Sequence, residues 1–331
     1  MRVQRGGERL LAANGVQLCV ETFGRPGDPA VLLIAGAACS MDWWADEFCL
    51  TLAAGSRFVV RYDLRDTGRS VSSEPGAPDY TGADLVADAA GLLDALGLAS
   101  AHVVGMSAGG GLAQHLATEH PDRVATLTLL STSPAGPVDR ELPRAADRIR
   151  RVFDEPAPEP DWSDRAAVTE YIAEGERPFA GSHPFDEEGM RDLAGRVFDR
   201  TTDIAASMTN HWLLADGPTT PVSLPDIAAP TLVLHGTEDP LFPFGHAEAL
   251  ADAIPGARLV PLERAGHELP PRPLWSVVIP AILEHTARAR SAATREPRFG
   301  QASGAFSRPG PREGAAFPTS KDKPPAGGAP C

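Results

Sequence analysis

Ser107 is the residue of this sequence whose surroundings best suit chemistry. It lies in Gly105-Met-Ser-Ala-Gly109, between a short apolar run and a segment with a helical pattern to about His120. A serine on a sharp turn from strand to helix holds strained backbone angles, and small neighbours let the two arms of the turn pass each other. Gly105 and Gly109 are such neighbours, so we interpret Ser107 as a nucleophile. The alternative is a glycine-rich turn without chemistry, and the rest of the sequence has to decide between the two.

A serine hydroxyl needs a base within hydrogen-bond distance, and the base needs an acid that orients it. His267 is the candidate base, because it follows the last strand-like run and precedes the last helical pattern. Asp239 is the candidate acid, because it follows the preceding strand-like run; its neighbour Glu238 is the alternative. The chain order Ser107, Asp239, His267 is the one expected of a triad on an open α/β sheet.

Strand patterns and helical patterns alternate along the chain around these residues. The segment 9–23 predicts a hairpin around Asn14-Gly15, a strong signal for a two-residue turn. Further strands are predicted at 30–35, 57–62, 101–105, 124–130, 231–234 and 257–262, and helices at 44–54, 81–96, 109–120, 244–254 and 274–288. This alternation predicts an α/β fold with a doubly wound, mostly parallel sheet, whose ligands bind beyond the carboxyl ends of the strands.

Two regions interrupt the alternation. The segment 134–224 has amphipathic helical candidates at 144–153, 165–175 and 185–212, and we expect it to form a helical cap on a core made of 1–133 and 225–291. His183 and His211 fall in this cap and are candidates for contact with a substrate. The segment 292–331 is rich in Gly, Pro, Ala and Ser, so we expect a disordered tail.

Composition excludes several classes of function. The 331 residues carry a formal net charge of −14, which argues against nucleic acid and anionic membrane as partners. No apolar run approaches the length of a membrane helix, and the first residues lack the apolar core of a signal peptide, so we expect a cytoplasmic protein. The four cysteines, Cys19, Cys39, Cys49 and Cys331, have no metal-site spacing, and we expect free thiols and no metal. Lys321 and Lys323 are the only lysines, which excludes a Walker phosphate loop in the globular part.

Over about residues 8–290 the chain resembles serine-type α/β-hydrolases, and within that superfamily the aclacinomycin methylesterases and their relatives. The resemblance rests on Arg61-Tyr-Asp-Leu-Arg-Asp-Thr-Gly-Arg-Ser70, Ala101-His-Val-Val-Gly-Met-Ser-Ala-Gly109, Gly266-His-Glu-Leu-Pro270 and the cap stretch Pro184-Phe-Asp-Glu-Glu-Gly189. It implies the α/β-hydrolase fold, a Ser107 nucleophile, a His267 base and an Asp239 acid, acting through an acyl-enzyme without a cofactor.

The resemblance also implies an oxyanion hole made of two backbone N–H groups. Ala108 would supply the first. Many members of the superfamily carry His-Gly after the strand that corresponds to residues 31–34, whereas this chain has Ala35-Gly36-Ala37. The second donor is then expected at Ala37, with Gly36 as the alternative.

Bulky apolar residues follow the predicted strand ends near the triad or lie in the cap. They are Trp43, Trp44, Met106, Met208, Leu241, Phe242 and Leu269. For any one of them alone a core position is the better interpretation, but together they predict an apolar substrate pocket. We therefore expect a carboxylic ester hydrolase whose partner is a small, neutral, hydrophobic ester. The resemblance implies an acid part larger than the alcohol, as in the methyl ester of a polycyclic natural product.

Other functions remain open on the same scaffold. A lactonase, a carbon–carbon bond hydrolase or a cofactor-free perhydrolase would use the same three residues. A protein of a different class, a non-catalytic ligand-binding protein, would keep the fold and the pocket, but such receptors often lack a member of the triad.

Overall fold

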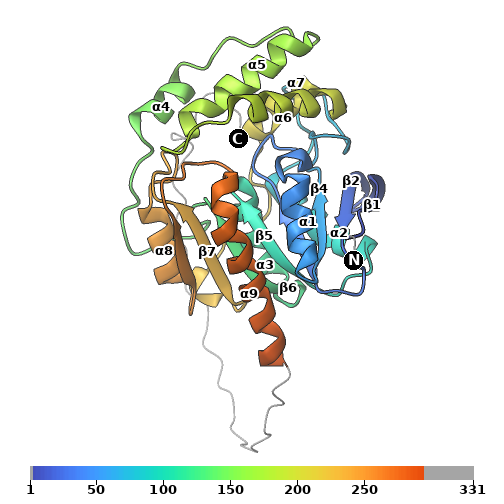
Figure 1. Cartoon of the computed structure of the whole chain (residues 1–331), viewed down its shortest axis with the longest axis vertical. Helices are drawn as coiled ribbons and strands as arrows, with labels where there is room; N and C mark the ends of the chain where they lie inside the picture. The colour runs from blue at the N-terminus through green and yellow to red at the C-terminus, as the bar shows by residue number, and fades with distance from the viewer. Residues whose placement is uncertain (1–2, 294–331) are drawn as a thin grey trace, which may run out of the picture.

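The computed structural model describes residues 3–293, and an eight-stranded sheet forms its centre (Figure 1). The strand order is β1-β2-β4-β3-β5-β6-β7-β8. β1 pairs with β2 and β2 with β4 in antiparallel fashion, and the other neighbours are parallel. The strands are β1 Arg9–Ala13, β2 Val16–Phe23, β3 Ala30–Ile34, β4 Phe58–Tyr62, β5 Ala101–Met106, β6 Val124–Leu130, β7 Thr231–Gly236 and β8 Arg258–Leu262. The predicted doubly wound, mostly parallel sheet is confirmed.

β1 and β2 form the predicted hairpin at one edge of the sheet. Ala13 pairs with Val16 across the two-residue turn. Asn14 and Gly15 have φ angles of 46° and 78°. These left-handed conformations are more accessible to asparagine and glycine than to other residues, so this dipeptide fixes the register of the hairpin.

Different helices cover the two faces of the sheet, because side chains alternate between the faces along each strand. In β3, Leu32 and Ile34 pack with α2, α3 and α8, whereas Val31 and Leu33 pack with α1 and α9. A strand buried on both faces is apolar throughout, which explains the continuous run in the sequence. The helices are α1 Asp46–Ala54, α2 Gly82–Ala95, α3 Ala108–Glu119, α8 Gly245–Ala253 and α9 Trp275–Ala293.

The segment between β6 and β7, which we interpret as a cap, lies over one end of the sheet (Figure 1). Its helices are α4 Asp147–Asp154, α5 Arg165–Glu176, α6 Glu187–Arg200 and α7 Ile204–Thr209. The expectation of one helix over 185–212 is wrong. The chain turns between α6 and α7, where the N–H of Thr202 donates to the carbonyl of Gly68 at 2.7 Å and Asp203 caps α7 through the N–H of Ala206.

Expectations about the cysteines and the chain end have mixed outcomes. Cys19 and Cys49 are buried free thiols, but Cys39 is disulfide-bonded, so the expectation of a free thiol is wrong there. Helix α9 continues to Ala293, and the rest of the segment expected to be a tail, with Cys331, lies outside the described residues. Within residues 3–293, no helix has the length and apolar character needed to cross a membrane.

Candidate active site

Ser107 sits on a sharp turn between β5 and α3. Its φ and ψ angles are 52° and −122°, a conformation that side-chain-bearing residues rarely adopt. A Cβ on Gly105 would lie 2.2 Å from the carbonyl oxygen of Gly109, and a Cβ on Gly109 would lie 2.3 Å from that of Ala35. Larger residues at these two positions would collide with backbone, so the glycines are required by the turn. The hydroxyl of Thr132 donates to the carbonyl of Ser107 at 2.7 Å and secures the strained peptide.

The structure brings Ser107, His267 and Asp239 together from three loops, each of which follows a parallel strand. Nε2 of His267 lies 3.0 Å from Oγ of Ser107, and Nδ1 lies 2.9 Å from Oδ2 of Asp239. The imidazole is buried between the two partners. This arrangement allows a proton to pass from the hydroxyl to the imidazole while the carboxylate orients the ring.

Asp239 is held as a carboxylate. Burial opposes its ionisation, but contact with His267 and hydrogen bonding outweigh burial and lower the pKa of Asp239. Its Oδ1 accepts the N–H groups of Leu241 at 2.9 Å and Phe242 at 2.8 Å. Glu238, the alternative acid, instead accepts two hydrogen bonds from Ser182. The acid position next to the imidazole is therefore occupied by Asp239.

The loop that carries His267 is braced by the cap. The N–H of His267 donates to the carbonyl of Phe179 at 2.8 Å. A Cβ on Gly266 would lie 2.4 Å from the N of Gly181, and one on Gly181 would lie 2.1 Å from the carbonyl oxygen of Arg264. This backbone-to-backbone packing explains the glycine before the histidine. It also ties the position of the base to the cap.

Ala37 and Ala108 line the same cavity as Ser107 and His267, whereas Gly36 is not part of its wall. The next residue, Ala38, has a φ of 61°, and its N–H donates to Nδ1 of His211 at 2.8 Å. Nε2 of His211 donates to the carbonyl of Arg65 at 2.8 Å. Burial lowers the pKa of His211, so the ring is neutral and carries its proton on Nε2. His211 thus holds the loop after β3 and does not line the cavity.

The cavity next to Ser107 has a volume of about 420 Å³ and mostly apolar walls. Two of the predicted pocket residues, Leu241 and Phe242, line it. Sequence analysis missed the aromatic residues that the cap contributes, Phe153, Phe179 and Trp212. Their only sequence signal was membership of amphipathic cap segments, which does not show that they face the nucleophile.

The other predicted pocket residues lie elsewhere. Trp43, Met106 and Leu269 line a second cavity of about 430 Å³. Trp44 and Met208 line neither cavity; both are buried in the hydrophobic cluster on the α1 and α9 side of the sheet. His183 is not hydrogen-bonded to a triad residue. Its Nε2 lies 2.9 Å from the carbonyl oxygen of Glu263. Among the described residues, no group of His, Cys, Asp and Glu side chains is arranged to hold a metal ion.

The model of the alpha/beta hydrolase fold family matches residues 29–270. The chain belongs to the α/β-hydrolase family. It is 34% identical to rhodomycin D methylesterase DauP of Streptomyces sp. (strain C5) and 33% identical to rhodomycin D methylesterase DnrP of Streptomyces peucetius. Each match covers 85% of this chain and 98% of the relative. Among solved structures, 2-hydroxy-6-oxo-6-phenylhexa-2,4-dienoate hydrolase from Rhodococcus sp. strain RHA1 superposes with a TM-score of 0.64 at 24% identity, covering 86% of this chain and 99% of that one. This last likeness shows the fold.

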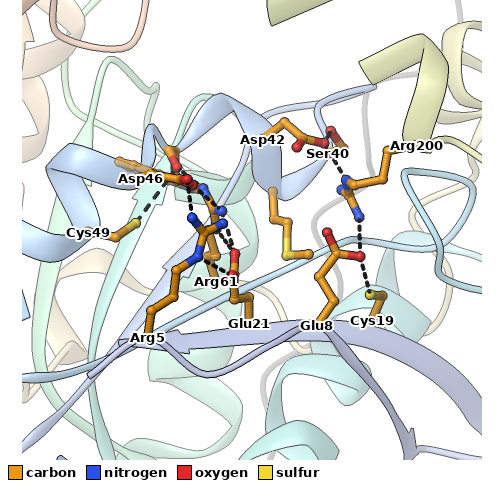
Figure 2. Close-up of polar contacts among 12 residues, drawn as sticks. Arg5, Glu8, Cys19, Glu21, Ser40, Asp42, Asp46, Cys49, Arg61 and Arg200 are labelled. Atoms are coloured by element: carbon orange, nitrogen blue, oxygen red, sulfur yellow. Dashed lines mark hydrogen bonds and ion pairs between the residues drawn. The ribbon is translucent and has the colours of Figure 1, made fainter. Parts of the chain in front are cut away.

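In this α/β-hydrolase, ion pairs fasten the cap to the loops around the site (Figure 2). Arg200 of α6 pairs with Asp42 at 2.7 Å and with Asp63 at 2.5 Å. Asp63 also accepts the N–H groups of Met41 at 2.8 Å and Arg69 at 3.0 Å. The Asp-x-Arg-x-x-Gly-x-Ser signature therefore has a structural role here, because its aspartate joins the loops after β3 and β4 to the cap.

Arg61 and Glu21 form a second buried pair at 2.5 Å beside this network (Figure 2). Arg5 and Asp46 join it at the surface. A charged cavity of about 570 Å³ lies above these residues. Five of the six arginines in its wall, all but Arg196, pair with carboxylates, so the wall is mainly an ion-pair network.

Proposed function

We propose that the protein is a carboxylic ester hydrolase in which Ser107 is the nucleophile, His267 the base and Asp239 the acid. The observation that carries the proposal is the hydrogen-bonded chain from Oγ of Ser107 through the imidazole to the carboxylate, at 3.0 and 2.9 Å. A serine triad with this geometry, beside a cavity able to admit a substrate, supports acyl transfer.

In the proposed reaction, Oγ of Ser107 attacks the ester carbonyl carbon and its proton passes to Nε2 of His267. The carbonyl oxygen becomes negative and accepts hydrogen bonds from the N–H groups of Ala108 and Ala37. Helix α3 begins at Ala108, so the positive end of the helix dipole also stabilises the negative charge on the oxygen. When the tetrahedral intermediate collapses, the carbon–oxygen bond breaks and His267 protonates the departing alcohol.

The second half of the reaction releases the acid. A water molecule gives a proton to Nε2 of His267 and attacks the acyl carbon of the acyl-enzyme. Collapse of the second intermediate returns the proton to Oγ of Ser107 and frees the carboxylic acid. The low pKa of Asp239 keeps its negative charge in place while the imidazolium exists, which lowers the energy of both transition states.

The proposed substrate is a neutral, hydrophobic ester whose acid part is larger than its alcohol. The walls contributed by Phe153, Phe179, Trp212, Leu241 and Phe242 support the apolar character. The size asymmetry is supported by the two relatives that are named as methylesterases of rhodomycin D.

A fluorophosphonate probe and a panel of esters test this function. We expect the probe to label Ser107, as read by peptide mass mapping, and to abolish hydrolysis. We also expect methyl esters of polycyclic aromatic acids to be hydrolysed faster than acetate esters of long alcohols, lactones or carbon–carbon substrates of equal size. Absence of labelling would reject the serine mechanism, and preference for the acetate esters would reject the assignment of the acyl side.

A further inference from the structure

A second cavity lies next to the catalytic residues and is separate from the one that Ser107 lines. Its volume is about 430 Å³. Met106, the residue before the nucleophile, lines it, as do Glu268 and Leu269, the two residues after the base. The wall of this cavity therefore includes immediate chain neighbours of both the nucleophile and the base. Much of its remaining wall comes from the cap helix α6 and includes Leu193.

Glu176, the last residue of α5, is the unusual member of this wall. Its exposed fraction is 4%, and its Oε1 has no hydrogen-bond partner among the described residues. Buried polar atoms are nearly always hydrogen-bonded, because an unpaired one loses its hydration without replacement. Glu176 lines the cavity, and its unpaired Oε1 lies beneath the surface of the wall, so a ligand in the cavity could give this oxygen a partner once the side chain turns toward it.

The charges around Glu176 define the kind of partner. Of the other carboxyls in the wall, Asp42 pairs with Arg200 and Asp186 caps α6 through the N–H of Gly189. Arg272 pairs with Glu47.

The remaining charged groups of the wall are the carboxyls of Glu176, Glu268 and Asp192 and the guanidinium of Arg196. Asp192 and Arg196 are four residues apart on α6 and carry one charge of each sign, so they add no net charge to the wall. Glu176 and Glu268 therefore give the wall more acidic than basic groups.

Burial affects the protonation of both glutamates. Burial, and then the charge of Glu268, raises the pKa of Glu176 well above its usual range. Burial likewise raises the pKa of Glu268, although its Oε1 accepts the N–H of Gly266 at 3.2 Å. Burial therefore favours the neutral form of Glu176 in the folded protein. A bound cation would reverse this balance, because the carboxylate form would then be stabilised by an opposite charge at short range.

We propose that the second cavity binds a protonated amine carried by a largely apolar molecule, with Glu176 as the counter-ion. An ammonium group offers three donors, enough for Oε1 of Glu176 and for Glu268. The apolar body would pack on Trp43, Met106 and Leu269. The proposal rests on the proposed function in one respect, since it assigns the amine to the acyl part of the ester.

Three methyl esters of one aromatic acid, with side arms of equal length ending in an amine, a hydroxyl or a methyl group, test the assignment to substrate. We expect kcat/KM of the wild type to favour the amine over the methyl arm by about tenfold or more, mainly through KM. Glu176→Gln keeps the shape and removes the group that can ionise when an amine binds, so its amine-to-methyl ratio should fall toward one. Glu174→Gln, on the same helix but in an exposed ion pair with Arg177, is the matched control and should keep the wild-type ratio.

Binding of 4-phenylbutylamine, measured by calorimetry in two buffers of different ionisation enthalpy, tests the site without turnover. We expect the amine to bind at least about tenfold more tightly than 4-phenylbutan-1-ol, and to release a proton as Glu176 ionises. This comparison uses the wild type and so does not depend on how a variant folds. Equal binding of amine and alcohol, or equal affinity of Glu176→Gln and wild type for the amine, would overturn the proposal.

The two measurements separate failure of the subsite from failure of the function. Hydrolysis of all three esters at similar kcat/KM, with no amine-specific binding, would overturn the subsite and leave the esterase proposal standing. Binding of the amine that depends on Glu176, without hydrolysis of any ester, would support the site and reject the esterase.

Discussion

At the scale of single residues, the roles proposed for the triad depend on how each side chain is fixed by its neighbours. Ser107 is strained, with a φ of 52°, and is held by the hydroxyl of Thr132. Strain of this kind is worth about 1–3 kcal/mol and persists where the surroundings determine the conformation. Asp239 is fixed by the two backbone N–H groups that follow it. The reacting groups are therefore in position before a substrate binds, which supports catalysis by preorganisation.

Substitution of the triad tests these roles. Ser107→Ala and His267→Ala should each lower kcat/KM by about 10³-fold or more. The first removes the oxygen that attacks the ester, and the second removes the base that takes its proton. Asp239→Asn should retain more activity than either, since the imidazole remains present. The measurement is turnover of a reactive aryl ester together with the melting temperature. Ser163→Ala, an exposed serine of the cap, serves as a control for the loss of a hydroxyl. Near-wild-type turnover by either alanine variant would refute the assignment.

The sequence supplied the three triad candidates because each follows a parallel strand, and parallel strands end at the same edge of a sheet. The same rule failed for Trp44, and Met208, which was predicted from the cap, is buried in the same hydrophobic cluster. Trp44 is next to the loop after β3, but its ring is buried against Phe48 of α1 at a centroid distance of 5.7 Å. A position beyond a strand end fixes the backbone, whereas packing in an irregular loop decides where the side chain points.

At the scale of secondary-structure elements, the sheet and its covering helices followed from periodicity, while the cap did not. β6 runs from Val124 to Leu130, the range that its apolar run predicts. The pattern over 185–212 is also amphipathic, yet α6 ends at Arg200 because the chain there is tied to the core through Asp63 and Gly68. Such a tertiary contact cannot be read from local periodicity. Asp203, as an N-cap residue, was the one local signal for the new helix.

His211 connects two elements, and its substitution tests whether the cap positions the loop after β3, which carries the proposed oxyanion donor Ala37. It joins the N–H of Ala38 to the carbonyl of Arg65, from its own place in the short 3-10 helix Asn210–Leu213. His211→Ala should release the loop that carries Ala37 and lower kcat by about 10- to 100-fold with a smaller change in KM, since small displacements of a catalytic group have effects of that order.

The matched variants for this test are His183→Ala and His211→Asn. His183 is a cap histidine whose Nε2 contacts Glu263 and not the loop after β3, so its loss should leave kcat unchanged. The amide of His211→Asn both accepts and donates a hydrogen bond, so this variant should recover part of kcat. An alanine variant at 211 that loses stability but keeps the wild-type kcat would show that His211 only supports the fold.

At the scale of the whole molecule, stability depends on pH through groups whose pKa values differ between the folded and unfolded states. Asp239 has a lowered pKa when folded, so its contribution is present above the ordinary aspartate pKa of about 3.9 and is lost as the pH falls through the folded pKa. Glu176 and Glu268 have raised pKa values when folded. Between the ordinary glutamate pKa of about 4.3 and these raised values, the folded state binds more protons than the unfolded chain. Stability therefore falls as the pH rises through that window.

Thermal unfolding of Glu176→Gln from pH 5 to pH 8 measures how much Glu176 contributes to the pH dependence of stability. Glutamine has no proton to lose, so the melting temperature of the variant relative to the wild type should rise steadily with pH, as the buried glutamate of the wild type is forced toward its charged form. Glu174→Gln should give a constant difference over the same range, because the ion pair with Arg177 lowers the pKa of Glu174 and this carboxyl stays ionised in both states above pH 5. A constant difference for Glu176→Gln as well would mean that the carboxyl is already charged in the folded protein at pH 5. In that case Glu176 would already be a carboxylate in the second cavity, and no bound cation would be needed to ionise it.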